Sequence, residues 1–361
     1  MGKPDVRAEP LPEAEYPAWD QFVASAPTGS IYGRADYLDA LCTAAGGRFR
    51  VLAARQGDVL LGGVGLYERD SRFGRFVSPR LLLYYNGPIL RQHPTKYPSE
   101  QTARDLKALT ALASALRGPE LGSTILKPRS PLVDVRPFLA QGWTAHHGYT
   151  YVVSISDLEQ ARGRIEHNLR RLIDRCARAE MTVTQDDDFE AFFSIHKQTM
   201  ERVGFQVYLP KAAFQQYYAT LARQGLARLF HARLPDGRPV ATQLVLLGHE
   251  VTHTVSAGAE NEHLKSGATA LLRWRVFEHL SGLGHTGNDL TDASLNAVTH
   301  FKSQLGGTLE RWVELKSPQS ARFAWGARMT QFISMSRSAA GAVVRRTLAN
   351  GRAQPDEAAN D

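Results

Sequence analysis

Cysteine is scarce in this chain, with Cys42 and Cys176 the only two among 361 residues. They lie far apart and neither has a second sulfur ligand nearby, so we expect no disulfide framework and a reducing, cytoplasmic compartment. Cys176 falls on the apolar stripe of a predicted helix, a position typical of a buried, inert thiol rather than a nucleophile.

Long hydrophobic runs are missing as well. No apolar stretch reaches the roughly 18–20 residues that a membrane-spanning helix needs, so we expect no transmembrane segment. The sequence after Met1 continues into acidic and proline-containing residues without an apolar core. A secretory signal is therefore not expected.

Signatures of several enzyme classes are also lacking. Twelve histidines occur, but none has a carboxylate partner at metal-ligand spacing on a convincing helix, so we expect no metal site. The cluster Gly62-Gly63-Val64-Gly65 lacks the Lys-Ser/Thr and the helix of a phosphate-binding loop, and a hairpin strand is the better interpretation. The absence of a Gly-x-Ser-x-Gly sequence argues against a serine hydrolase.

The overall composition is that of a soluble globular protein, with 43% apolar and 22% charged residues. A chain of this length accommodates two domains. The net charge of +7 favours an anionic partner such as a nucleic acid, a phosphorylated substrate or a membrane surface. Much of the excess lies in residues 162–178 and 328–352, and charge alone leaves these alternatives open.

The first half of the sequence alternates helices and strands. A helix is predicted over 35–45, followed by a hairpin whose strands, 50–54 and 59–67, are joined by Gln56-Gly57-Asp58. These turn residues tolerate tight backbone geometry. A strand over 81–85, a helix over 102–117 and a strand over 123–127 complete this half.

The second half repeats the rhythm. A helix is predicted over 157–179, where Ser156 and Glu159 have the spacing of a capping box. A second helix over 188–202 ends at Gly204. The strands and helix that follow are predicted over 228–233, 240–247, 251–258, 264–280 and near 288–292. The repetition suggests two α+β modules from an old duplication, although alternation of this kind also occurs in unrelated mixed chains.

Four short stretches carry a resemblance to a known family. They are Gly29-Ser30-Ile31-Tyr32 running into Tyr37-Leu38, then Tyr85-Asn86-Gly87-Pro88, then the basic helix from His167 to Ala177 with Thr199 to Phe205 after it, and lastly Phe301-Lys302 with Gly306-Gly307. In this order they resemble the FemABX-type transferases, which are built from tandem GNAT-like domains, or the closely related acetyltransferase domain. The resemblance covers residues 19–316.

The resemblance implies an α+β fold of two tandem GNAT-like modules with mixed sheets flanked by helices. We expect an N-terminal module over 1–150 on the acceptor side, a C-terminal module over 151–325 on the donor side, and a basic flexible tail over 326–361. Family members transfer an amino acid from aminoacyl-tRNA, or another acyl group, to an amine. Fold likeness alone does not fix the chemistry, so each residue needs its own physical argument.

Lys302 is the principal catalytic candidate. Acyl transfer develops negative charge on the carbonyl oxygen in the transition state, and an ammonium group near that oxygen stabilises it. Phe301 beside it would exclude water and stack against the donor. Asp292, with Asp289, is a candidate for ordering the acceptor amine. The alternatives are a solvent-exposed lysine and ordinary turn acids.

The donor candidates are Lys265, Ser266, Gly267 and Ala268, at a predicted helix start where small residues can bind an anion. GNAT enzymes that use acyl-CoA usually have Arg/Gln-x-x-Gly-x-Gly/Ala here, and this chain keeps only the central glycine. The departure favours aminoacyl-tRNA over acyl-CoA as co-substrate. No tightly bound cofactor is expected.

The acceptor candidates are Arg202, Tyr85, Asn86 and Tyr32. The resemblance implies that Arg202 grips phosphates of a nucleotide-linked acceptor, whereas its position also suits a cation at a helix C-terminus. Asn86 stands where wall-building relatives often have arginine, which argues against a peptidoglycan precursor. The acceptor is expected to be an amine on a small molecule or a cell-envelope precursor.

A basic stripe at helical spacing, Arg164, Asn168, Arg171 and Arg175, makes tRNA a candidate partner, with a solvated helix face as the alternative. Two further functions stay open: a non-catalytic ligand-binding module that keeps the fold, and a basic RNA-binding or scaffold protein.

Overall fold

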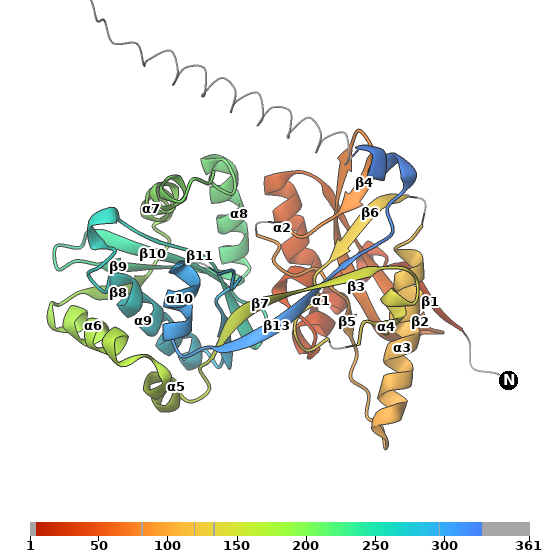
Figure 1. Cartoon of the computed structure of the whole chain (residues 1–361), viewed down its shortest axis with the longest axis horizontal. Coiled ribbons are helices and arrows are strands. Elements are labelled where there is room, and N and C mark those ends of the chain that lie inside the picture. Colours follow the sequence, from red (N-terminus) through yellow and green to blue (C-terminus); the bar gives the residue numbers. More distant parts are fainter. Residues whose placement is uncertain (1–4, 81, 119, 133, 296, 327–361) are drawn as a thin grey trace, which may run out of the picture.

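The computed structural model describes residues 5–326, apart from 81, 119, 133 and 296. Within these residues the chain forms two lobes that lie side by side (Figure 1). The end of the described sequence returns to the N-terminal lobe, where the Ser317 N–H donates to the carbonyl of Thr124. The expected tail over 326–361 lies outside the described residues except for its first position. No helix in the described ranges combines the length and apolar character needed to cross a membrane.

The N-terminal lobe has helices packed against a twisted sheet. Its longest helix, α3, begins at a proline in its first turn, where the missing N–H costs no helical hydrogen bond. Its strands are β1 (Val6–Pro10), β2 (Arg48–Gln56), β3 (Val59–Ser71), β4 (Gly74–Val77), β5 (Ile89–Leu90) and β6 (Leu121–Leu126), and its helices are α1 (Tyr16–Ser25), α2 (Ala35–Ala45), α3 (Pro98–Ala115) and α4 (Arg136–Leu139).

In the C-terminal lobe the long helix α9 packs against strands β9, β10 and β11 of the sheet. α9 is buried over most of its circumference, as expected for a helix enclosed by other elements. The strands are β7 (Thr144–Ser154), β8 (Thr182–Gln185), β9 (Ala227–Arg233), β10 (Pro239–Leu246), β11 (Val251–Ala259), β12 (Gly287–Asp289) and β13 (Thr308–Lys316), and the helices are α5 (Leu158–Arg164), α6 (His167–Arg178), α7 (Phe189–Arg202), α8 (Lys211–Arg223), α9 (Ala268–Gly282) and α10 (Ala297–Gln304).

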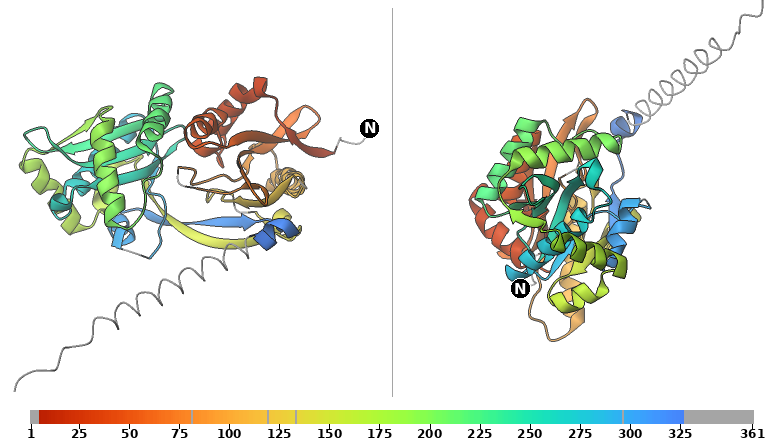
Figure 2. Two further views of the ribbon diagram at one scale, coloured as in Figure 1. Left: turned by 90° about the horizontal axis from the view of Figure 1, so that it is seen from above. Right: turned by 90° about the vertical axis from the view of Figure 1, so that its left-hand side faces the viewer.

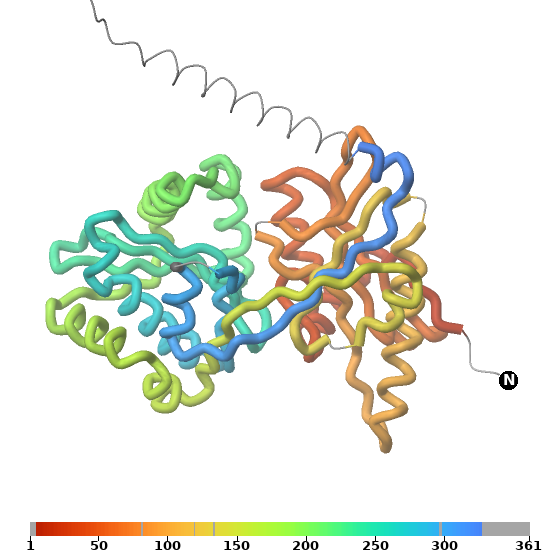
Figure 3. Tube along the Cα trace, viewed as in Figure 1, coloured from red at the N-terminus to blue at the C-terminus, as the bar shows by residue number. Residues whose placement is uncertain are grey.

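Two long strands join the lobes. β7 and β13 pair antiparallel from Thr308 opposite Val152 to Lys316 opposite Thr144. Figure 2 shows this ribbon crossing from one lobe to the other, and the two segments run together in the tube of Figure 3. The end of β13 pairs with β6, whereas the end of β7 pairs with β12, so one sheet continues through both lobes. The domain boundary at 150/151, which stays a prediction, falls inside β7.

A second junction is made by helices. α2 and α8 pack together, and the hydroxyl groups of Tyr37 and Tyr217 are 2.7 Å apart within a buried cluster that draws residues from both lobes. Both rings are fully buried. α8 was not anticipated from the sequence. Together the strand ribbon and the α2–α8 contact fix the position of one lobe relative to the other.

The sequence prediction of a single helix over 157–179 is wrong. α5 ends at Arg164 and α6 begins at His167, because Ile165 is extended and the Glu166 N–H donates to the carbonyl of Gln304 at 2.9 Å. The capping box is wrong too, since the Asp157 side chain caps α5 by accepting from the Gln160 N–H. A contact from the distant α10–β13 turn therefore decides where this helix is interrupted.

Two other predicted elements differ from the structure. The strand over 81–85 is replaced by an isolated bridge between Arg80 and Leu83. The helix over 264–280 starts later, at Ala268, because Gly267 has a left-handed backbone with φ of 101°. By contrast, the helix over 35–45 is confirmed, and the two hairpins agree with the structure to within a few residues at each end.

Candidate active site

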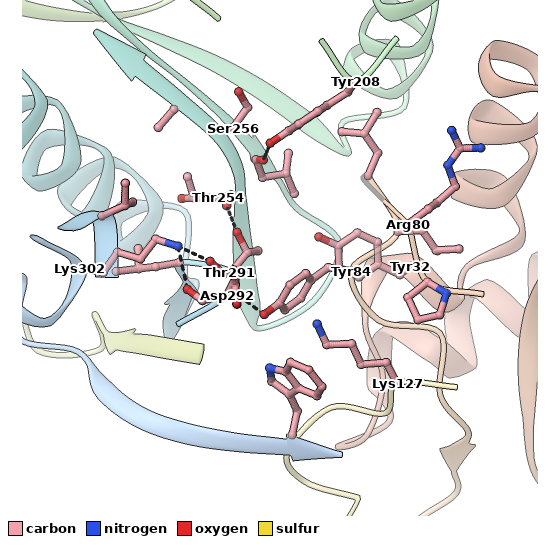
Figure 4. Close-up of a pocket in the computed structure, with 18 of the residues that line it drawn as sticks. Tyr32, Arg80, Tyr84, Lys127, Tyr208, Thr254, Ser256, Thr291, Asp292 and Lys302 are labelled. Carbon is pink, nitrogen blue, oxygen red and sulfur yellow. Dashed lines mark hydrogen bonds between the residues drawn. The ribbon is translucent and has the colours of Figure 1, made fainter. Parts of the chain in front are cut away.

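A cavity of about 560 Å³ opens between the two lobes, a size that suits a small-molecule ligand. Arg80, Tyr84 and Lys127 reach it from the N-terminal lobe, whereas Lys302 comes from α10 on the other side (Figure 4). Other parts of the wall come from β11, α9 and β13, from the loop after β12, and from Tyr32 and Tyr208.

The β11 wall contains an irregularity. Thr254 pairs with Val245 and Ser256 pairs with Leu244, so Val255 has no register partner on β10. A bulge of this kind leaves one residue outside the ladder, and bulges are common beside active sites. Ser256, next to it, forms a 2.9 Å hydrogen bond with Nδ1 of the buried His196. Burial lowers the pKa of that imidazole to about 4, which keeps it neutral near pH 7.

Lys302 is held at the cavity by two backbone carbonyls. Its ammonium donates to the carbonyl oxygens of Thr291 and, at 2.8 Å, of Asp292. Burial and the nearby Arg273 guanidinium lower the pKa of Lys302 to about 8, against opposing effects of Asp292 and Asp289. The side chain is thus fixed, partly buried and mostly charged at pH 7, as an oxyanion-stabilising cation requires.

The loop that receives Lys302 has unusual backbone geometry. Thr291 and Asp292 have φ values of 48° and 60°, in the left-handed region that residues other than glycine seldom adopt. The loop is held by the Thr291 N–H, which donates to Asp289 at 2.8 Å, and by the Thr291 hydroxyl, which donates to the carbonyl of Thr254 at 2.9 Å. Strained backbone that surrounding contacts enforce is concentrated at functional sites.

Lys127, which sequence analysis missed, is a second buried ammonium in the cavity. Its nitrogen lies 3.3 Å from the centre of the Tyr84 ring and 3.7 Å from that of Trp312. Burial lowers the pKa of Lys127 to about 8, although Asp289 and Asp292 oppose the shift. The one available signal was a lysine that ends an apolar strand just before Pro128.

Asn86 holds Lys127 in place. The Lys127 N–H donates to the Asn86 side chain at 2.8 Å, and the Asn86 N–H donates to the carbonyl of Lys127 at 3.1 Å. The Asn86 amide group also donates to the carbonyl of Ile125 at 2.9 Å. Asn86 therefore contacts backbone instead of reaching the cavity, and its role as an acceptor ligand stays a prediction.

Tyr85 and Tyr32 belong to a buried network behind the cavity wall. The Tyr85 hydroxyl donates to Asp289 at 2.8 Å, and Thr150 donates to the other oxygen of the same carboxylate. Burial raises the pKa of Tyr85 well above its usual value, so the hydroxyl stays a donor. Tyr32 is fully buried, lines the cavity and packs against Tyr85 and His253.

Several predicted residues lie elsewhere. Phe301 packs against the core of the C-terminal lobe and is not among the cavity-lining residues. The Arg202 guanidinium donates to the carbonyl of Ala259 and, at 2.7 Å, to the side chain of Asn261, so it anchors the loop after β11. These contacts do not test the roles proposed for either residue.

The predicted donor segment faces α6. The Ser266 hydroxyl accepts from the Ala268 N–H at 3.1 Å, and the carbonyl of Ser266 accepts from Arg175 at 2.8 Å. A Cβ added to Gly267 would lie 3.0 Å from both Cys176 and Leu172 of α6. Lys265 is exposed at this edge, and none of residues 265–268 lines the cavity between the lobes.

The basic stripe lies along the exposed side of α5 and α6. Asn168, Arg171 and Arg175 border a shallow hollow of about 360 Å³. Arg164 instead donates to Gln160 at 2.7 Å and to the carbonyl of Ser154 at 3.2 Å. Among the described residues, no group of three or more His, Cys, Asp or Glu side chains is arranged to hold a metal ion.

Comparison with known proteins places this geometry in context. Residues 160–303 match the model of the acetyltransferase (GNAT) domain family. The crystal structure of FemX is similar, with 15% identity, a TM-score of 0.63, and coverage of 85% of this chain and 96% of FemX. No curated protein sequence matches the chain significantly.

Two further solved structures share the fold. The C-terminal domain (DUF2156) of a protein assigned as lysylphosphatidylglycerol synthetase from Agrobacterium fabrum is 12% identical, with a TM-score of 0.57 and coverage of 86% of this chain and 94% of that one. The structure of L-PGS from Bacillus licheniformis is 11% identical, with a TM-score of 0.53 and coverage of 81% and 95%. At such identities the likeness shows the fold.

Proposed function

We propose that this chain is a GNAT-like acyltransferase of the FemABX type, which transfers an activated acyl group to an amine in the cavity between its lobes. The α+β fold of two GNAT-like modules expected from the sequence is confirmed. The observation that carries the proposal is Lys302, whose ammonium is fixed by two carbonyls at the cavity wall.

Lys302 supplies electrostatic stabilisation in the proposed reaction. The amine nitrogen attacks the donor carbonyl carbon, the carbonyl oxygen becomes negative, and the ester or thioester bond then breaks as the nitrogen loses its proton to the leaving group or to water. A preorganised ammonium beside the oxygen stabilises charge that exists only in the transition state. Val255, at the bulge of β11, lines the same cavity, and its carbonyl accepts a hydrogen bond from the Tyr208 hydroxyl at 3.4 Å.

The acceptor amine is proposed to lie near the loop after β12. Asp292 lines the cavity, and its carboxylate accepts from Ser294 at 2.9 Å. Asp289 is buried and already bonded to Tyr85 and Thr150, so it supports the wall more than it contacts a ligand. Of the two acids, Asp292 is the one proposed to order the amine.

Aminoacyl-tRNA is the proposed donor. A pyrophosphate bound at a helix start needs accessible backbone N–H groups. At the start of α9 the Ala268 N–H donates to the Ser266 hydroxyl, and Gly267 and Ala268 are both buried, so these two positions do not offer free N–H groups at the surface. The name lysylphosphatidylglycerol synthetase describes a relative whose product carries an amino acid, and the basic face of α6 suits an RNA backbone. A cytoplasmic location accords with this donor.

Acyl-CoA is the alternative donor. The match of residues 160–303 to an acetyltransferase domain favours it, since GNAT domains of that kind use acyl-CoA as co-substrate. The donor is a transient co-substrate in either case.

Transfer assays test the proposal. Purified protein is incubated with labelled aminoacyl-tRNA or acyl-CoA and a panel of amines on small molecules and envelope precursors. We expect amide formation with aminoacyl-tRNA. We expect Lys302→Met to lower kcat by about 10²–10³-fold, the usual effect of removing one oxyanion-stabilising donor. Lys197→Met, an exposed lysine paired with Glu201 on α7, is the matched control and should leave kcat unchanged. Undiminished turnover in Lys302→Met would remove this lysine from the mechanism.

A further inference from the structure

Arg273 is a buried cation, and among the described residues two of its three nitrogen atoms have no hydrogen-bond partner. Only 5% of the residue is exposed, and its Nε and Nη1 atoms form no hydrogen bond within the described part of the chain. No carboxylate in that part forms an ion pair with it. Arg233 shows the usual arrangement, because its guanidinium contacts Asp186 at 3.0 Å and Asp188 at 3.1 Å. Arg273 is therefore unlike an ordinary structural arginine.

A buried, unpaired guanidinium is costly, because it has lost water and gained no anion in exchange. Native proteins satisfy buried charges with a counter-ion or a ligand. Arg273 lines the cavity between the lobes, so a ligand in the cavity can reach it. We propose that Arg273 binds a terminal carboxylate or phosphate monoester of the acyl acceptor.

The other charges around the cavity favour an anion. Lys302, Lys127 and Arg80 also line it, whereas Asp292 is the acid in its wall. Arg273 helps to lower the pKa of Lys302, so the two cations are close enough to repel each other. A bound anion would relieve that repulsion and leave Lys302 more fully protonated.

Burial decides which kind of anion fits. An internal phosphodiester carries a substituent on each side, and these substituents hinder a close approach to a guanidinium that is only 5% exposed. A terminal carboxylate or phosphate monoester carries a substituent on one side only, so its free oxygens can approach Arg273. The cavity volume of about 560 Å³ suits such a small acceptor. The acceptor therefore carries both an amine and a terminal anion, as an amino acid or a phosphorylated amine does.

The inference deepens the proposed function, on which it rests for assigning the anion to the acceptor. Binding of a terminal anion is measured without any donor, so it succeeds or fails independently of acyl transfer. If binding holds while transfer fails with every donor, the proposed function falls and the anion site stands. If transfer holds while binding fails, the anion site falls alone.

Calorimetry and intrinsic tryptophan fluorescence, to which the cavity residue Trp312 contributes, measure binding to the full chain. Three probes separate the sources: N-acetylglycine carries a carboxylate, methyl phosphate carries a phosphate monoester, and N-acetylglycinamide is the neutral control. We expect the wild type to bind at least one of the anions and not the amide. Arg273→Met should weaken that binding at least tenfold, and Arg273→Lys should weaken it less.

Arg275→Met is the matched control, because Arg275 lies two residues further along α9 and pairs with Glu278 at 2.8 Å. It should leave anion binding unchanged. Removing an uncompensated buried charge should also raise the Tm of the ligand-free protein in Arg273→Met, whereas loss of a structural arginine would lower it. Equal anion binding by wild type and Arg273→Met, no anion binding by the wild type, or a lowered Tm with unchanged affinity would overturn the inference. If Arg273→Met does not fold, Arg273→Lys and Arg273→Gln decide on affinity alone.

Discussion

The ammonium nitrogen of Lys127 lies 3.3 Å from the centre of the Tyr84 ring, with Trp312 on another side at 3.7 Å. Aromatic rings attract a cation through their negative faces, and the attraction grows when water is excluded. The contact therefore holds a positive charge at the N-terminal side of the cavity, opposite Lys302. The contact joins the residue after β6 to Tyr84 and to Trp312 of β13, which are distant in sequence.

Lys127→Met should weaken acceptor binding. The variant keeps the apolar stem between the rings but removes the charge, so KM for the acceptor should rise about tenfold to a hundredfold, as for loss of a charged hydrogen bond. The value of kcat should change less. Steady-state kinetics at saturating donor check this. Lys316→Met, which removes an exposed lysine paired with Glu314 on β13, is the control. A fall in kcat with unchanged KM would contradict a binding role.

The pH dependence of transfer should reflect the titration of the Lys302 ammonium. Its pKa is lowered to about 8, so the ammonium is present below that pH and lost above it. Because the proposed mechanism needs the charged form, kcat/KM should fall as pH rises through about 8. Lys302→Arg keeps its charge at higher pH and should shift this descending limb upward.

Lys127 also has its pKa lowered to about 8, so the two lysines must be separated. The profile is therefore measured in a Lys127→Met background over pH 6–10. If the descending limb persists in the Lys127→Met background and shifts to higher pH in Lys302→Arg, the titrating group is Lys302. A limb that stays at the same pH in Lys302→Arg would assign the titration to another group.

Gly267 should tolerate no side chain. Its φ of 101° is strained for other residues, and an added Cβ would meet Leu172 and Cys176 at 3.0 Å. Gly267→Ala should therefore lower the free energy of unfolding by about 1–3 kcal/mol, measured with urea. Gly163→Ala is the control, because that glycine lies in α5 with nothing within 4 Å and should gain up to about 1 kcal/mol. Equal stability of Gly267→Ala and the wild type would show that α6 yields at this contact.

Local sequence patterns predicted the elements that depend on nearby residues. The helix over 35–45 was predicted correctly, and so was the first hairpin turn, where Gly57 has a positive φ. The interruption between α5 and α6 was missed because it depends on the Glu166 bond to Gln304. No local signal marks a contact of that range.

The residues of the cavity also differ in whether the local sequence predicted them. Lys302 was placed from its motif, and the structure puts it at the wall between the lobes. Lys127 was missed because its meaning depends on Tyr84 and Trp312, which approach it only in the folded chain. Arg273 was missed because it sits in an apolar helix, where nothing local tells a paired arginine from an unpaired one.

Arg171 tests whether α6 binds RNA. It is exposed beside Asn168 and Arg175 at the hollow on α6 and forms no ion pair within the described residues. A phosphate contact releases counterions, so each one adds about 0.7–0.9 to the slope of log K against log salt. Arg171→Glu should weaken tRNA binding and reduce the magnitude of that slope by about 0.7–0.9, the contribution of one phosphate contact. Filter binding at several salt concentrations measures both. Arg238→Glu, which reverses an exposed arginine paired with Glu260, is the control and should leave the slope unchanged. An unaltered slope in Arg171→Glu would mean that this face of α6 is only solvated.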